Sequence, residues 1–558
     1  MAITSATGGQ RSTGRDSGIQ AAIDFVTASH ARALAVLAIV SLVTFLPGFF
    51  QLPPIDRDEA RYAQATKQMS ETGNYIDIRY QDVPRYLQPA GIYWLQTVAV
   101  KLTGYGTYAP IWVHRLPSLI GATLAVLLSY WIALPFVGAT GSFVAALFMA
   151  VSILLGVEAR LAKTDAVLLA SILGATGFLA RAYLGHAIGW AGAMGFWIAM
   201  AAGVVVKGPL IVVVVGSTTA ALCIIDRSAA WLRALRPLPG IAVLLLLALP
   251  WYIAIGIVSD GEFYRIAIGK SFLGKVGAGE QGHGAPPGFY LALFSLTFWP
   301  AAGLTLMAAP WVWRHRAERP VRFCLAWIIP TWLIFEVVAT KLPHYVLPVY
   351  PAIAILIVMA LLAGWRPWTL LAWLIAFAAL AYAVLGPVLL YVLEGQVAWV
   401  VIVIALTGVG IAIGGVRFAR SESIVEYPVT IVAAAVLIHA ANFGLVMPRL
   451  DSVWVTPRLV AAVKRQAPCA DPQVISAGFW EASLVFLAGT KTQFVFGEDA
   501  AKLMGARGCR VALVSPEYEK IFLDAMLQQP RQVELRERIT GINIGNGRTQ
   551  DIGVYVQK

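Results

Sequence analysis

Polar segments divide the chain into a long series of apolar runs. A helix that crosses the ~30 Å hydrocarbon core of a bilayer needs about 20 mostly apolar residues. Runs of about that length occur at 33–50, 116–137, 141–157, 165–182, 189–206, 208–225, 239–258, 288–312, 323–340, 346–364, 368–392, 397–415 and 428–446. The pattern predicts an all-α polytopic membrane protein with about thirteen transmembrane helices.

The composition supports this fold class. Of the 558 residues, 59% are hydrophobic and 13% are charged, whereas soluble proteins carry roughly 25% charged residues. A water-soluble globule is therefore excluded. Residues 1–32 lack the apolar core of a signal peptide, so we expect a cytoplasmic N-terminal segment followed by an uncleaved anchor.

The formal net charge of +12 raises the question of nucleic-acid binding, but the arginines have another explanation. Short cytoplasmic loops of membrane proteins are enriched in Lys and Arg. With the N-terminus in the cytoplasm, the loops expected on that side contain Arg227, Arg233, Arg236, Arg314, Arg316, Arg319, Arg322, Arg366, Arg417 and Arg420. We interpret this charge as a topology signal and expect no nucleic-acid partner.

The same topology places three long segments on the opposite, periplasmic side. Two interrupt the predicted transmembrane domain, residues 33–446: a first loop at 51–110, and a Gly-rich loop at 259–287 that we expect to be mobile. The third is the tail, residues 447–558, in which short strand-like runs alternate with helical stretches. It predicts a small α/β domain. A lid or structural cap and a role in reading the substrate both remain open for it.

Two of the four cysteines, Cys469 and Cys509, lie in this tail, and Cys223 and Cys324 lie in apolar runs. No spacing among them suits a zinc site. Because an oxidising compartment permits disulfides, we predict a bond between Cys469 and Cys509. The alternative is a pair of buried free thiols.

The first periplasmic loop contains a predicted helix at residues 56–73. Asp56 and Glu59 have the spacing of a capping box, and Gly73 suits the C-terminal cap. The charges in this helix have two explanations. Acids in a first turn complement the helix dipole.

Alternatively, these residues belong to a functional site. Side chains three and four positions apart share one face of a helix, so Asp58, Arg61 and Tyr62 point the same way. The part of the loop that returns to the membrane adds Arg85 and Gln88. The aromatic residues near them are also explained by the aromatic belt at a membrane interface.

Further polar residues are expected at the same periplasmic face. Asp165 begins one predicted helix, Lys207 lies between two others, and Lys341, His344 and Tyr345 connect another pair. A lysine that reaches from a helix end to the interface explains any one of them. Their convergence with the acidic cluster indicates a site, because ionisable groups at membrane depth are costly and commonly functional.

These residue types suit one chemistry. Cations at the outer membrane edge can hold the phosphate of a lipid carrier without a metal. A nearby carboxylate can act as a base or stabilise positive charge that grows on a transferred sugar. The residues therefore indicate a glycosyltransferase that uses a lipid-linked sugar.

Several motifs resemble a known family. Asp58-Glu59-Ala60-Arg61-Tyr62-Ala63, followed by Lys67-Gln68-Met69, resembles the Asp-Glu-x-Arg-Tyr-Ala…Arg-Glu-Met motif of bacterial GT-C glycosyltransferases of family 83, which includes the lipid A aminoarabinose transferases. Further matches, in the same order along the chain, are Pro89 to Tyr93-Trp94, Lys207-Gly208, Pro250-Trp251 and Lys341 to Leu347. The helical layout with a periplasmic C-terminal domain is also similar.

The resemblance implies a GT-C fold and roles for individual residues. It implies that Asp58 and Asp165 are the catalytic carboxylates. It also implies that Arg61, Tyr62, Lys207 and Tyr345 bind the donor sugar or its phosphate, and we add Arg85, Gln88, Lys275, Lys341 and His344 as further candidates for this role.

The chain also departs from the aminoarabinose transferases. It has Leu87-Gln88-Pro89 where they commonly have Glu-Lys-Pro, and Ser271-Phe272 followed by Lys275 where they have Glu-His followed by Arg. A phosphate-binding lysine and the metal-binding residues are thus missing. Arg85 and Lys275 are candidate substitutes for that lysine. We expect no metal and no cofactor, and the donor sugar stays open among aminoarabinose, galacturonic acid, mannose and others.

The sequence therefore predicts a monomeric, multi-pass glycosyltransferase of the bacterial inner membrane. It would move a monosaccharide from an undecaprenyl-type polyprenyl phosphate to lipid A or another envelope glycan at the periplasmic face, with inversion. The rival hypothesis is a transporter or flippase of a lipid-linked sugar, which predicts polar residues near mid-membrane. A non-catalytic scaffold leaves the charged first loop unexplained.

Overall fold

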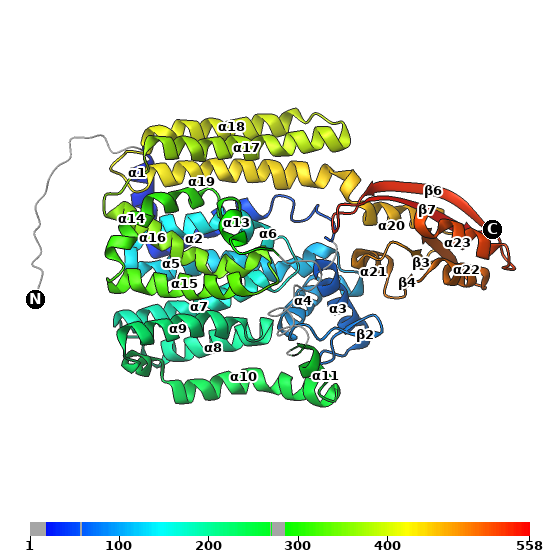
Figure 1. Cartoon of the computed structure of the whole chain (residues 1–558), viewed down its shortest axis with the longest axis horizontal. Helices are drawn as coiled ribbons and strands as arrows, with labels where there is room; N and C mark the ends of the chain where they lie inside the picture. Colours follow the sequence, from blue (N-terminus) through cyan, green and yellow to red (C-terminus); the bar gives the residue numbers. More distant parts are fainter. Residues whose placement is uncertain (1–17, 56–57, 268, 270–284) are drawn as a thin grey trace, which may run out of the picture.

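The computed structural model describes residues 18–55, 58–267, 269 and 285–558. These residues form a long helical body and a small α/β domain at one end, where the C terminus also lies (Figure 1). Most of the predicted loop at 259–287, including Lys275, falls outside the described residues.

The apolar runs form the helices of the body. Its main helices are α1 (Gly18–Thr27), α2 (His30–Phe45), α5 (Ile111–Ala150), α6 (Ile153–Glu158), α7 (Asp165–Leu184), α8 (Gly189–Lys207), α9 (Leu210–Asp226), α10 (Pro237–Val258), α13 (Phe289–Thr297), α14 (Leu304–His315), α15 (Arg319–Val337), α16 (Tyr350–Leu362), α17 (Thr369–Glu394), α18 (Trp399–Gly415) and α19 (Glu426–His439). Among the described residues, 9 helices are long and apolar enough to cross a membrane, or up to 10 if the bent pair α1 and α2 is one span.

This number is lower than the thirteen predicted runs for local reasons. Helix α5 contains two of the runs, separated by a kink at Gly138, whose φ of 66° is outside the helical range. Helix α9 has 17 residues and is slightly short. The run at 288–312 is broken into α13 and α14.

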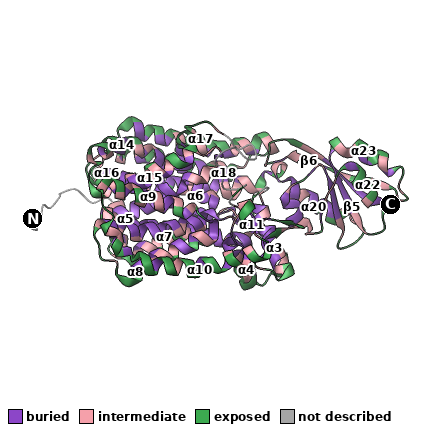
Figure 2. Ribbon diagram, turned by 60° about the horizontal axis from the view of Figure 1, so that its bottom comes forward, coloured by how far each residue is buried: buried purple, intermediate pink, exposed green. Residues whose placement is uncertain are grey.

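The body packs a continuous apolar core and also exposes apolar side chains on its outer surface. Buried residues lie between the helices (Figure 2), with Trp327, Tyr130 and Phe148 among the fully buried ones. Leu246 on α10 and Phe377 on α17 are exposed. A large exposed apolar surface of this kind matches a bilayer environment.

The predicted first loop at 51–110, which we call the first outer segment, forms a compact unit at the end of the body that faces the small domain (Figure 1). It consists of α3 (Asp58–Thr72), a hairpin of β1 (Arg79–Tyr80) and β2 (Val83–Pro84), and α4 (Gly91–Thr103). Gly73 follows α3 with a φ of 71°, as its predicted capping position requires. Asp56, the other end of the predicted capping box, lies outside the described residues.

The small domain is built on a five-stranded sheet of order β4-β3-β5-β7-β6. Its strands are β3 (Gln473–Ala477), β4 (Gln493–Phe494), β5 (Arg510–Val514), β6 (Val533–Ile542) and β7 (Thr549–Gln557). Strands β4, β3 and β5 are parallel, and β7 and β6 continue the sheet in antiparallel pairs. Its helices are α20 (Val455–Gln466), α21 (Ala482–Ala488), α22 (Gly497–Gly505) and α23 (Pro516–Met526). They form two separate apolar clusters with the sheet.

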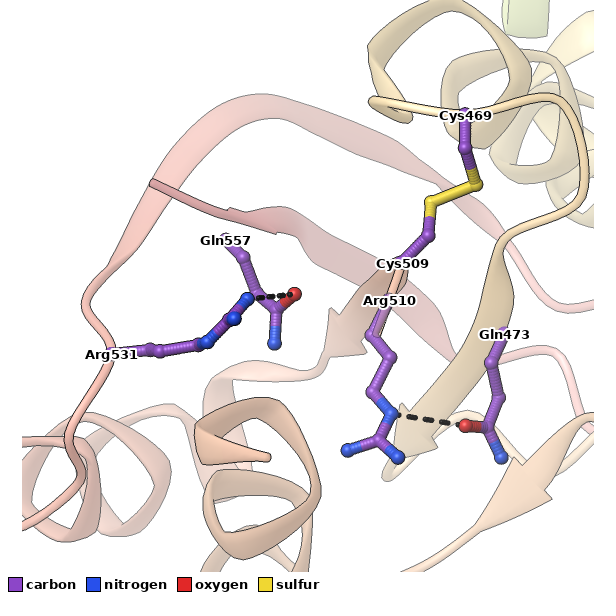
Figure 3. The surroundings of a disulfide bond; sticks show 6 residues. All are labelled: Cys469, Gln473, Cys509, Arg510, Arg531 and Gln557. Carbon is purple, nitrogen blue, oxygen red and sulfur yellow. Dashed lines mark hydrogen bonds between the residues drawn. A yellow bond between two sulfur atoms is a disulfide. The ribbon is translucent and has the colours of Figure 1, made fainter. Parts of the chain in front are cut away.

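Cys469 and Cys509 form a disulfide in this domain, the pair expected from the sequence (Figure 3). The bond joins the segment after α20 to the residue before β5. Next to it, Arg510 Nε donates a hydrogen bond to Gln473 Oε1 at 3.0 Å (Figure 3). The disulfide therefore lies at the end of the sheet where β3 and β5 begin.

Candidate active site

A cavity of about 720 Å³ lies where the first outer segment meets the helical body. The polar residues that line it are Asp58, Tyr62, Gln88, Lys163, Thr164, Asp165, Lys207, His344 and Tyr345. The apolar residues of its lining include Val204, Leu210, Val212, Val213, Leu244, Ile334 and Val338. The cavity therefore combines a charged region with an apolar wall built from membrane helices.

An ion pair between two helix ends forms part of the charged region. The Lys207 ammonium group, at the end of α8, donates a hydrogen bond to Asp165 Oδ1 at 2.5 Å. Asp165 is the first residue of α7. A carboxylate at a helix N-terminus and an ammonium group at a C-terminus are each favoured by the dipole of their own helix. Gly208 follows Lys207 with a φ of 67°, which lets the chain turn sharply into α9.

A second acid, Glu158, extends this cluster. Lys163 Nζ lies 3.1 Å from Glu158 Oε1 and 3.6 Å from Asp165 Oδ2. His344 Nδ1 lies 3.6 Å from Glu158, and its Nε2 lies 3.4 Å from Asp165. Burial raises the pKa of Glu158 to about 7. Burial also lowers the pKa of Lys163, but Glu158 and Asp165 outweigh that effect and raise it, so the lysine is charged.

The oxygen and nitrogen ligand atoms of Glu158, Asp165 and His344 lie within 4.8 Å of one another, as in a metal site. The surroundings do not fit a resident divalent cation. The ammonium groups of Lys163 and Lys207 already neutralise the two carboxylates, and they would repel a metal ion at the same place. The cluster is better described as a binding site for an anion.

A second group of polar residues comes from the first outer segment. Asp58, whose side chain is 58% exposed, lies 4.0 Å from the guanidinium group of Arg85. The Arg85 guanidinium group also stacks over the ring of Tyr62 at 4.9 Å. Burial is the main reason that the pKa of Tyr62 is raised well above its ordinary value, so its phenol stays a neutral hydrogen-bond donor.

Two buried oxygens in the lining indicate that the cavity binds a polar ligand. Gln88 Oε1 and Thr164 Oγ1 have no hydrogen-bond partner among the described residues. Buried polar atoms in proteins are nearly always paired, with protein, water or ligand. These two oxygens therefore mark positions where hydroxyl or amide groups of a ligand can bind.

A buried ion pair fixes the beginning of α3. Arg115 is fully buried and donates hydrogen bonds to both carboxylate oxygens of Glu59, at 2.7 and 2.9 Å. Glu59 also accepts from the backbone N–H groups of Ile55 and Ala162, at 2.8 and 2.9 Å. Glu59 thus joins α3 to α5 and to the turn before Asp165, beyond the capping role expected from the sequence. The sequence signal for Arg115 was a charge directly before the apolar run at 116–137.

The small domain contacts the same unit. Phe486, at the end of α21, packs in an apolar cluster with Ala63, Ile111 and Ala162. Gln64 on α3 donates a hydrogen bond to Thr490 Oγ1 at 2.8 Å. The domain therefore rests on the helix that carries Asp58.

Most of the residues expected from the sequence meet at this cavity. Asp58, Tyr62, Gln88, Asp165, Lys207, His344 and Tyr345 line it. Arg85 lies directly behind Asp58 and Tyr62.

Besides Arg85, two expected residues among the described ones are absent from the cavity lining. Arg61 is absent from its lining. Lys341 is also absent, because its ammonium group donates to the carbonyl groups of Phe335 and Val338, at 3.2 and 2.8 Å, and so caps α15. Lys275 lies outside the described residues. Glu158 and Lys163 belong to the site but were not assigned to it from the sequence, although both lie in the short polar segment before Asp165.

Residues 87–253 match the family described as dolichyl-phosphate-mannose-protein mannosyltransferase. The chain is 26% identical over 307 residues to the undecaprenyl phosphate-alpha-4-amino-4-deoxy-L-arabinose arabinosyl transferase of Erwinia tasmaniensis. It is 27% identical over 330 residues to the protein of that name from Edwardsiella ictaluri. These alignments cover 54% and 58% of both chains, so the chain spans little more than half the length of these relatives.

Solved structures show the same fold over nearly the whole chain. ArnT from Cupriavidus metallidurans, in the apo state, superimposes with a TM-score of 0.72 at 18% identity, covering 94% of this chain and 98% of that one. The same protein bound to undecaprenyl phosphate gives 0.71. The oligosaccharyltransferase of Archaeoglobus fulgidus gives 0.52 at 12% identity, covering 92% of this chain and 70% of that one. The resemblance inferred from the motifs is thereby confirmed: the chain has the GT-C fold and is a sequence relative of the aminoarabinosyl transferases.

Proposed function

We propose that the protein is a glycosyltransferase that moves a monosaccharide from an undecaprenyl-type polyprenyl phosphate to lipid A or another envelope glycan. The observation that carries this proposal is the cavity, in which Lys163, Lys207 and Asp165 adjoin an apolar wall from α8 to α10 and α15. A polyprenyl phosphate sugar combines a charged phosphate with a long apolar chain and needs both surfaces. The named relatives transfer a sugar from such a carrier.

In the proposed reaction, the bond between the anomeric carbon and the phosphate oxygen breaks. An acceptor oxygen forms the new bond to that carbon from the opposite side, which inverts its configuration. The phosphate leaves with the bonding electron pair, and the ammonium groups of Lys163 and Lys207 stabilise its charge. Tyr62, Tyr345 and Gln88 line the same cavity and supply hydrogen bonds to the donor.

Asp58 is proposed as the catalytic carboxylate because it lines the cavity and remains 58% exposed. It can therefore meet an acceptor that enters from outside. If the acceptor group is a hydroxyl, Asp58 takes its proton. If it is a phosphate that is already ionised, Asp58 stabilises positive charge on the sugar. Asp165 holds the two lysines in place next to the leaving phosphate.

The topology belongs to the same proposal. Thirteen crossings follow if the two parts of α5 are separate spans and α2, α9 and the α13–α14 pair each cross once. Residues 33–446 then form the transmembrane domain, and residues 447–558 and the cavity lie on the periplasmic side of the inner membrane. The arginines at the opposite end of the body support this orientation. The protein acts as a monomer in this proposal.

Mass spectrometry of envelope lipids from a deletion strain tests the function. The proposal expects one sugar to be missing from lipid A or another envelope glycan, and expects the parent gene to restore it. A strain that carries Asp165→Asn instead should remain deficient while producing normal amounts of protein. Envelope lipids identical to those of the parent strain would contradict the proposal.

A further inference from the structure

The small domain carries a cluster of three aromatic side chains, Trp480, Phe496 and the half-buried Tyr518, which we name the aromatic platform. Trp480 and Phe496 are 49% and 58% exposed. The rings of Trp480 and Tyr518 are nearly parallel, with centroids 6.4 Å apart, and Phe496 lies 5.4 Å from Trp480 and 5.9 Å from Tyr518. A cluster of exposed large aromatic rings on a soluble domain marks an interaction surface.

The platform lies where a sheet of this type binds ligands. Each ring follows the carboxyl end of a different parallel strand: Trp480 follows β3, Phe496 follows β4 and Tyr518 follows β5. In open α/β sheets, ligands bind outside the carboxyl ends of the strands. The position of the platform is therefore typical of a binding site.

This edge of the sheet faces the helical body. β5 begins beside the last residues of β7, since Val511 pairs with Val556, and the C terminus lies at the end of the domain away from the body (Figure 1). The carboxyl ends therefore point back towards the body. At that end, Gly541 packs so closely on the Ser452 carbonyl group that a Cβ would lie 2.5 Å from it. Ser452 N–H in turn donates to Glu394 at the end of α17, at 2.8 Å.

One short helix connects the platform to the cavity. Trp480 lies two residues before α21, and Phe486 on that helix packs against Ala63 of α3. A helix of seven residues spans ~10 Å. The platform is therefore close to the helix that carries Asp58, on the side from which an acceptor approaches.

Polar groups accompany the rings. Ser515 is 7% exposed, and its hydroxyl group has no hydrogen-bond partner among the described residues. Ser515 directly follows β5, and its hydroxyl oxygen and the Tyr518 ring both lie next to Gly478, the residue after β3. Next to Trp480, Glu481 is held by a hydrogen bond of 2.6 Å from Asn543. Hydroxyl and carboxylate groups beside flat aromatic rings are the combination that recognises a sugar.

We propose that the aromatic platform binds a saccharide ring of the acceptor and holds it beside the cavity. The C–H groups on one face of a sugar pack against the electron-rich faces of Trp480 and Phe496, while its hydroxyl groups bond to Ser515 and Glu481. This proposal rests on the proposed function, since it takes the acceptor to be a glycan. It assigns the small domain a substrate-reading role.

Saturation-transfer NMR on the full-length protein in detergent tests the platform directly. The probe is the water-soluble oligosaccharide released from bacterial lipopolysaccharide by mild acid, without any donor. We expect transfer to its C–H protons with the parent protein, and loss of most of it with Trp480→Ala and with Phe496→Ala. Trp480→Phe, which keeps an aromatic ring, should retain part of the signal. Trp399→Ala is the matched control, because Trp399 is an exposed aromatic residue at the start of α18.

The same variants are then compared in the transfer reaction. Trp480→Ala should raise the KM for the acceptor by about tenfold with little change in kcat, because the platform binds the acceptor but does not touch the reacting atoms. No oligosaccharide signal with the parent protein, or an equal signal with Trp480→Ala and Phe496→Ala, would overturn the proposal. Variants that keep the sugar signal but lose binding to anionic vesicles without sugar would also overturn the proposal, because the platform would then be a membrane anchor. The NMR experiment measures oligosaccharide binding without any transfer reaction. A failure of the proposed function would appear only in the transfer assay and is therefore distinguished from a failure of the platform proposal.

Discussion

The ammonium group of Lys207 and the carboxylate of Asp165, 2.5 Å apart, join the end of α8 to the beginning of α7. Both side chains are buried, with 6% and 7% exposure. Lys163, 3.6 Å from the other oxygen of Asp165, places a second positive charge on this carboxylate. The two lysines and this one carboxylate together carry a net positive charge at the membrane edge, where a lipid-linked phosphate can reach it.

Asp58→Asn should leave donor binding nearly unchanged and lower turnover. The substitution keeps the size of the side chain and removes its charge, which the proposed mechanism needs only in the transition state. We expect a loss of about 10²–10³ in kcat. The measurement is transfer from a radiolabelled polyprenyl phosphate sugar, alongside donor binding. Turnover within about threefold of the parent would show that Asp58 serves only as the first residue of α3 and has no catalytic role.

Glu59→Gln should destabilise the protein. Glu59 neutralises the fully buried Arg115, and removing one partner of a buried ion pair typically costs about 3–5 kcal/mol. The thermal midpoint of the purified protein in detergent should fall. Glu498→Gln, which removes an exposed acid on α22, serves as the control. Equal midpoints for the two variants would show that the Glu59–Arg115 pair contributes little.

Glu158 should make stability depend on pH. Its pKa of about 7 means that the folded protein keeps this proton until the pH reaches about 7, whereas the unfolded chain releases it near the ordinary value of about 4.5. Stability from this group therefore falls as the pH rises from about 4.5 to about 7. Glu158→Gln should flatten this part of the profile of thermal midpoint against pH. Lys163, Asp165, Lys207 and His344 face the same carboxylate and remain in the variant.

A slope that remains in Glu158→Gln includes any contribution of His344, whose ring nitrogens also face Glu158 and Asp165. His344→Gln in the same background separates the two groups. An unchanged slope in Glu158→Gln would contradict the assignment of the proton to Glu158.

Transfer should need no divalent metal. The two lysines already neutralise Glu158 and Asp165, as the ion-pair distances show. We expect the purified protein to keep its activity after treatment with EDTA and removal of the chelated ions. Loss of transfer that a single metal restores would refute this prediction.

The helical body was predictable because each membrane-spanning helix needs its own apolar run. The breaks inside those runs were not, since they depend on single residues such as Gly138, where α5 kinks. The strand-like runs of the tail indicated an α/β domain, but β6 has no such pattern, because its Leu535 to Arg538 stretch is mostly charged. That strand is identified by its pairing with β7, which a local pattern does not show.

The site was predictable where polar residues begin or end apolar runs, as Asp165 and Lys207 do. Lys341 was expected at the cavity, but in this structure its ammonium group caps the preceding helix, an interaction that depends on backbone geometry. The contact of Glu59 with Arg115 joins residues 56 positions apart and has no local signal. The placement of Phe486 against α3 depends on how the small domain docks, which the sequence of either part does not reveal.

The central proposal is that this cavity transfers a sugar from a polyprenyl phosphate. The most direct test is to incubate the purified protein with undecaprenyl phosphate sugars and envelope lipids extracted from the deletion strain, and to measure both products by mass spectrometry. The account predicts equal amounts of free polyprenyl phosphate and glycosylated acceptor with the parent protein, and at most about 1% of that with Asp165→Asn. Formation of neither product by the folded parent protein with any donor sugar would contradict it, as would equal yields from the parent and Asp165→Asn.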